Sequence, residues 1–115
     1  MSRDVSFQEL YLNNPASNYL SEIKAESDNL FSEIFIMDFQ GCNVALSDLT
    51  SDFWQGDEAK FKKSFNGGDG SIYIDKIRRD ESTKLYQVQV SLPVVDIIDG
   101  KVIGAITIGI DIGKL

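Results

Sequence analysis

The clearest structural pattern in this chain lies in residues 84–112, KLYQVQVSLPVVDIIDGKVIGAITIGIDI. They contain two apolar runs, at about 84–93 and 101–112, which are rich in branched side chains. Branched residues favour strands, and Asp99-Gly100 between the runs is a hairpin signal. This stretch therefore predicts a long antiparallel hairpin.

The two predicted strands carry different kinds of side chain on their two faces, because alternate residues of a strand point to opposite sides. The polar row of the first strand is Gln87, Gln89 and Ser91. The row of small residues in the second is Ala105, Thr107, Gly109 and Asp111. Small side chains leave room for a ligand above a sheet, or let a helix pack closely. The polar row fits either a solvated face or a ligand that supplies hydrogen-bond partners.

Further strands are predicted on the N-terminal side of this hairpin. Residues 33–38 and 43–47 are two short apolar runs joined by Asp38-Phe39-Gln40-Gly41, which has Asp and Gly at the first and fourth turn positions. Another strand is expected at 71–79, followed by a tight turn at 80–83.

Helical patterns occupy three other segments. Apolar residues at helical spacing over 15–31, after Asn14-Pro15 as N-cap and first helical residue, predict a long amphipathic helix. Shorter helices are expected at 6–12 and at 57–65, the latter opened by Asp57.

This order of elements predicts one α+β domain over residues 1–115. Its sheet, within residues 33–112, should be antiparallel and five-stranded. The N-terminal helices, within residues 6–31, should place the long helix on one face. A short helix and loop from 47–70 should cover a ligand pocket on the other.

Composition excludes several classes of function. The net charge of −7 disfavours binding to nucleic acid or anionic lipid. The sequence has no histidine and one cysteine, Cys42, so it lacks histidine-based catalysis, an internal disulfide and a multi-cysteine zinc site. We therefore expect no enzyme, no metal and no cofactor.

Several short stretches resemble the Cache family of PAS-like sensor domains, over roughly residues 15–115. They are 38–45 (DFQGCNVA), 50–58 (TSDFWQGDE), 80–83 (DEST), 90–94 (VSLPV), 103–106 (IGAI) and 109–112 (GIDI). The resemblance implies an extracytoplasmic, periplasmic domain of an inner-membrane receptor, such as a chemoreceptor or sensor histidine kinase. It also implies flanking membrane helices in the full-length protein and a small-molecule partner.

Amino-acid-binding members of that family carry Arg-x-Trp-Tyr in the segment that caps the pocket. The matching residues here are Ser51-Asp52-Phe53-Trp54, without the arginine that grips a carboxylate at two points. A short-chain carboxylate is therefore the expected ligand. The alternatives are an amino-acid sensor and a structural or dimerisation module without ligand, and a homodimer is compatible with each.

The expected ligand contacts combine the capping segment with the polar and small rows of the sheet. They are Trp54, Gln55, Gly56, Tyr73, Gln89, Ser91 and Asp111. Each also has a purely structural interpretation. Trp54 is equally suited to a hydrophobic plug, Tyr73 to sheet packing and Asp111 to ending a strand.

Overall fold

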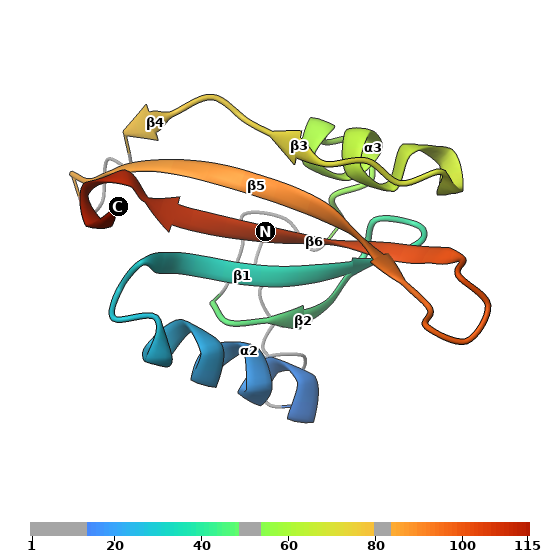
Figure 1. Ribbon diagram of the computed structural model, residues 1–115, viewed down its shortest axis with the longest axis horizontal. Coiled ribbons are helices and arrows are strands. Elements are labelled where there is room, and N and C mark those ends of the chain that lie inside the picture. Colours follow the sequence, from blue (N-terminus) through green and yellow to red (C-terminus); the bar gives the residue numbers. More distant parts are fainter. Residues whose placement is uncertain (1–13, 49–53, 80–83) are drawn as a thin grey trace.

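The computed structural model describes residues 14–48, 54–79 and 84–115. One antiparallel sheet has the strand order β2-β1-β6-β5-β3, and β4 also pairs with β5 (Figure 1). Its strands are β1 (Phe31–Asp38), β2 (Asn43–Leu46), β3 (Tyr73–Ile74), β4 (Arg78–Arg79), β5 (Tyr86–Val95) and β6 (Val102–Asp111). The helices are α2 (Pro15–Glu26) and α3 (Ala59–Phe65), with single 3-10 turns η1 (Asn66–Gly68) and η2 (Ile112–Lys114). The predicted α+β class with an antiparallel sheet is confirmed.

The long hairpin predicted from residues 84–112 is β5–β6. Strand β6 lies at the centre of the sheet and pairs along its length with β5 on one side and β1 on the other. At the tip, Gly100 has a φ of 74°, and the Asp99 carboxylate accepts a hydrogen bond from the backbone N–H of Lys101 at 2.9 Å. The Asp-Gly turn signal therefore located this hairpin correctly.

The turn between β1 and β2 also has the predicted chemistry. Asp38 Oδ1 accepts hydrogen bonds from the backbone N–H groups of Gln40 at 2.9 Å and Cys42 at 3.0 Å. Gly41 has a φ of 87°, in the left-handed region where a side chain is strained. A Cβ at this glycine would also lie 2.4 Å from Gly56 Cα, so the turn is packed closely against residues 54–56.

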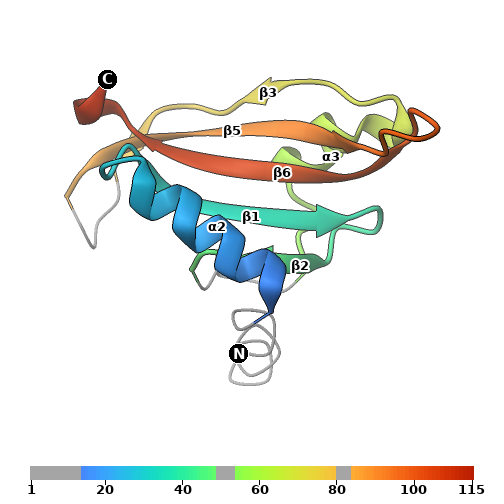
Figure 2. The same ribbon diagram turned by 60° about the horizontal axis from the view of Figure 1, so that its bottom comes forward.

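Helix α2 lies across β1 and β2 on one face of the sheet (Figure 2). Asn14 caps it by accepting a hydrogen bond from the backbone N–H of Ser17 at 2.8 Å, as predicted. Its Leu20 packs against Ile34 and Ala45.

The predicted extent of this helix, 15–31, is wrong. The helix ends at Glu26 because Asp28 and Asn29 adopt positive φ values of 55° and 67°. Phe31 then begins β1. The helix predicted at 6–12 and the turn predicted at 80–83 lie outside the described residues.

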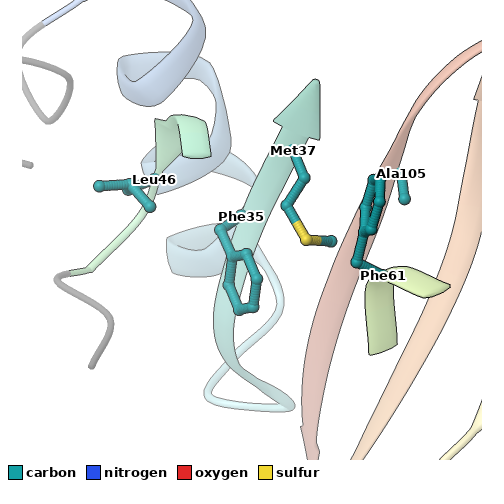
Figure 3. Packing of buried hydrophobic residues seen from close by; sticks show 5 residues of the cluster. All are labelled: Phe35, Met37, Leu46, Phe61 and Ala105. Carbon is teal, nitrogen blue, oxygen red and sulfur yellow. The ribbon is translucent and has the colours of Figure 1, made fainter. Parts of the chain in front are cut away.

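Helix α3 lies on the opposite face, against β5 and β6. Phe61 joins a buried cluster with Phe35, Met37, Leu46 and Ala105, and Figure 3 shows Met37 directed from β1 toward Phe61 and Ala105. The helix starts at Ala59, with Glu58 rather than Asp57 at the N-cap position. The sheet therefore has an apolar core on each face.

The single strand predicted at 71–79 is two short strands, β3 and β4, along the same edge. Between them, Asp75 Oδ1 accepts a hydrogen bond from the backbone N–H of Lys76 at 2.7 Å. Such local side-chain bonds compete with the ladder of a sheet. The Asp75 N–H still donates to the backbone oxygen of Gln89 at 2.9 Å, and the regular strand is then interrupted until Arg78. Asp75 and Lys76 at this break line the hollow described next.

Candidate functional site

A cavity of about 410 Å³ lies between the start of α3, the β3–β4 edge and β5. Figure 1 shows α3 and β3 on the same side of β5. The lining residues are mostly charged or amide-bearing: Glu58, Ala59, Lys60, Tyr73, Asp75, Lys76, Arg78, Gln87 and Gln89. Its size is within the usual range for small-molecule sites, and its lining is more polar than most.

The two glutamines of β5 are held by residues of β1, two strands away. Gln89 Nε2 donates to a carboxylate oxygen of Glu33 at 2.9 Å, and Ser32 Oγ donates to Gln87 Oε1 at 2.8 Å. Glu33 and Gln89 both pair with Gly109 of the intervening strand β6. The three residues therefore form one row across the sheet.

Gly109 makes this row possible. A Cβ at Gly109 would lie 2.5 Å from Ser32 Oγ and 2.9 Å from Glu33 Cγ. Both distances are shorter than real side chains tolerate, so any larger residue would displace the side chains that reach over β6. Gly109, one of the small residues predicted in β6, thus leaves space for the hydrogen bonds that join β1 to β5 beside the cavity.

Tyr73 and Asp75 form a polar pair on the β3 side of the cavity. Tyr73 Oη lies 3.3 Å from Asp75 Oδ1, and an Arg78 nitrogen lies 3.6 Å from the same oxygen. Burial acts to raise the pKa of Asp75, but the Lys76 amide, the Arg78 guanidinium and the Tyr73 hydroxyl together hold it below its ordinary value. Burial and the Asp75 charge raise the pKa of Tyr73. Near neutral pH, Asp75 is therefore a carboxylate and Tyr73 a neutral hydroxyl.

Lys60 brings a positive charge to the α3 side. Its Nζ lies 4.0 Å from Glu58 and 5.6 Å from the centre of the Phe35 ring. The lining thus contains three cationic side chains (Lys60, Lys76 and Arg78) and two acidic ones, Glu58 and Asp75. This balance suits a ligand that carries negative charge.

Two of the seven predicted ligand contacts, Tyr73 and Gln89, line the cavity. Ser91 on β5 and Asp111 at the end of β6 are buried and bond within the protein. Ser91 Oγ lies 2.8 Å from Thr107 Oγ1, and Asp111 accepts from the backbone N–H of Gly113 at 2.9 Å, which caps η2. Asp111 thus caps the turn at the end of β6, and ligand contacts by Ser91 and Asp111 stay predictions.

The other three predicted contacts, Trp54, Gln55 and Gly56, do not line the cavity. Trp54 is half exposed, its ring lies against Gly56, and its Nε1 donates to the backbone oxygen of Gln40 at 2.8 Å. The backbone N–H of Gln55 donates to the Gly41 oxygen at 2.6 Å. This segment therefore fastens the β1–β2 turn, and a ligand contact there stays a prediction.

Replacing Trp54 with phenylalanine separates these two roles. Phenylalanine keeps an aromatic ring, although a smaller one, but lacks the N–H that donates to Gln40. The free energy of unfolding should therefore fall by about 1 kcal/mol. Chemical denaturation measures this change, and calorimetry of the folded variant measures ligand affinity. If Trp54 also contacts the ligand, as the sequence predicts, the affinity should fall several-fold; an unchanged affinity would leave Trp54 only its structural role at the turn.

Sequence reasoning missed much of the lining. Gln87 was assigned to the same polar row as Gln89, but its position beside the cavity depends on the β3–β4 edge. Lys60 and Arg78 look like ordinary surface charges in the sequence. Asp75 lies two residues from Tyr73, and this period-2 spacing is the signal that could have placed both on one face.

Other kinds of site have little support in the described parts of the chain. Residues 14–48, 54–79 and 84–115 contain no group of three cysteine or acidic side chains placed to hold a metal ion. No helix among them is both long and apolar enough to cross a membrane.

The fold is shared with several solved structures. The sensor domain of the V. cholerae histidine kinase DctB matches with a TM-score of 0.59 at 17% identity, over 83% of this chain and 36% of that one. The sensory domain of the Campylobacter jejuni chemoreceptor Tlp3, with isoleucine bound, gives 0.63 at 18%, over 87% and 40%. The ligand-binding domain of the Pseudomonas aeruginosa PAO1 amino acid chemoreceptor PctC, in complex with GABA, gives 0.59 at 13%, over 90% and 41%.

These similarities are structural, at low sequence identity. No family model matches the sequence, and no curated protein matches it. The chain spans about two fifths of the length of the solved structures. These neighbours are sensor or ligand-binding domains of signalling receptors, so the fold expected from the sequence is confirmed.

Proposed function

We propose that this chain, which has the fold of Cache-type sensor domains, is the extracytoplasmic small-molecule-sensing domain of a bacterial receptor. The observation that carries the proposal is the cavity of about 410 Å³ with convergent charged and amide groups, in a fold shared with ligand-binding sensor domains. Such a domain signals if the ligand binds one arrangement of helices and sheet better than another. It needs no catalytic group.

The cavity favours a small carboxylate as the ligand. Arg78 and Asp75 are separated by 3.6 Å, and the Arg78 side chain is 67% exposed, so this guanidinium still has donors for a second anion. Lys60 and Lys76 add positive charge nearby. Charge-assisted hydrogen bonds to a carboxylate are about twice as strong as neutral ones.

An amino acid is the second candidate for the ligand. The solved domains of Tlp3 and PctC hold isoleucine and GABA, which carry both charges. The acidic Glu58 and Asp75 beside the three cations also suit such a zwitterion.

The test compares two adjacent arginines of β4. Arg78 pairs with Gln87 on the cavity face, whereas Arg79 pairs with Tyr86 and is absent from the lining. Arg78→Gln should weaken the binding of a two- to four-carbon carboxylate roughly tenfold, which is about 1.4 kcal/mol. Arg79→Gln removes the same charge and should leave the affinity nearly unchanged. Isothermal titration calorimetry measures both.

Two outcomes would contradict the proposal. If both variants weaken binding equally, the attraction comes from overall charge and the ligand does not occupy the cavity. If no carboxylate or amino acid binds, the domain is not a sensor of these molecules.

A ligand-free dimerisation module is the alternative function. It is favoured by exposed isoleucines at the β3 edge of the sheet. Ile72 and Ile74, at 66% and 65% exposure, lie at the β3 edge, while α2 packs against β1 and β2. Analytical ultracentrifugation across a range of concentrations, with Ile74→Lys as the disrupting variant, distinguishes a dimer from a monomer.

The receptor setting is also part of the proposal. The domain would lie in the periplasm, joined to membrane helices and to the output module of a chemoreceptor or histidine kinase. A reporter enzyme that is active on only one side of the membrane, fused to the full-length protein, tests this location.

A further inference from the structure

The hydrogen bond between Gln89 and Glu33 fixes the orientation of the Gln89 amide. A carboxylate accepts hydrogen bonds and does not donate them, so Gln89 must turn its NH₂ group toward Glu33. Since Gln89 lines the cavity and Glu33 does not, the amide oxygen is the acceptor that this residue offers to a ligand, beside the second N–H of the same amide. That oxygen can only accept.

The neighbouring glutamine is held less strictly. Gln87 Oε1 accepts from Ser32 Oγ, and a hydroxyl group can either donate or accept. Rotation of Ser32 therefore permits the Gln87 amide to turn over, so it can adapt to either kind of ligand atom. Gln87 is thus a matched control on the same strand and in the same lining.

We infer that Glu33 is a positioning residue that makes Gln89 Oε1 a fixed acceptor, and that the site selects small carboxylates bearing a hydrogen-bond donor next to the carboxylate. The inference rests on the proposed function, in which Arg78 and the lysines attract the carboxylate. A hydroxyl group and an ammonium group both supply the required donor. An unsubstituted acid leaves Gln89 Oε1 without a partner, which lowers its affinity.

Three acids of equal carbon number test the inference: L-lactate with a hydroxyl, L-alanine with an ammonium, and propanoate with neither. Calorimetry on the wild-type domain should show lactate or alanine binding at least about tenfold more tightly than propanoate. Whichever of lactate and alanine binds more tightly identifies the preferred donor as hydroxyl or ammonium.

Two variants then test whether the preference for acids with a donor depends on the hydrogen bond between Glu33 and Gln89. Glu33→Gln replaces an acceptor by an amide that both donates and accepts, so Gln89 is free to turn and the preference should fall below about threefold. Gln89→Met removes the amide while nearly keeping its length, with the same expected loss. Gln87→Met removes another amide of the lining and lowers the affinity for all three acids alike, so the tenfold preference should be retained. Thermal unfolding confirms that each variant is folded, and Gln89→Met alone still decides the role of the amide if Glu33→Gln is unstable.

The outcomes separate this inference from the proposed function. Equal affinity for all three acids in the wild type overturns the inference but leaves a carboxylate sensor. A tenfold preference retained in Glu33→Gln shows that Glu33 does not position the amide. Absence of binding by any of the three, and by other small acids, overturns both.

Discussion

Ala105→Asp should abolish cooperative folding. Ala105 is fully buried on the central strand β6, where it contacts the cluster of Met37 and Phe61. A lone carboxylate there has no water and no cation, which costs several kcal/mol against a total stability of about 5–15 kcal/mol. Circular dichroism during heating should show no sharp transition.

Ile103→Asp is the matched control for this change. Ile103 is on the same strand, but it is 49% exposed, so its carboxylate would remain hydrated. We expect a much smaller loss and a cooperative transition. If Ala105→Asp unfolded as sharply as the wild type and at the same temperature, the core on the α3 face would be misplaced.

Phe35→Ala should lower the free energy of unfolding by about 3–5 kcal/mol. Phe35 is 1% exposed and is among the largest fully buried side chains in the described part of the chain. Its removal leaves a cavity between β1 and α3, and the surrounding cluster relaxes only in part. Urea denaturation with a linear extrapolation measures the change.

Phe39→Ala removes the same ring from an exposed position. Phe39 lies in the β1–β2 turn at 61% exposure, and its loss should change stability by about 0.5 kcal/mol or less. Similar losses at both positions would mean that the buried cluster contributes no more than surface contacts do. The Phe35 variant should also disturb the cavity, since Lys60 lies over its ring.

The parts of the fold that depend on local chemistry could be predicted from the sequence. The Asp38–Gly41 turn, the Asn14-Pro15 helix start and the β5–β6 hairpin are each determined by a few neighbouring residues. The end of α2 could not be predicted, because Leu30 and Phe31 continue the helical spacing while the backbone at Asp28 and Asn29 has already left the helix.

The site was less predictable because it depends on register between distant strands. Tyr73 and Gln89 were identified from their own strands. Glu33 was missed because its contact with Gln89 requires three strands to align at Gly109. Trp54 looks like a pocket aromatic in the sequence; in the structure its Nε1 donates to the Gln40 oxygen at the turn, and a ligand contact there stays a prediction.

The central position of β6 also affects the order in which the sheet can form. Residues 31–38 form most of their pairs with residues 104–111, which leave the ribosome last among the strands. Until then β1 has only the short β2 as a partner, and β5 lacks its main partner. A two-stranded hairpin alone is marginal in water, and unpaired strand edges promote aggregation. The sheet is therefore completed in one late step, when β6 pairs with both β1 and β5, and the chain depends on chaperones until then.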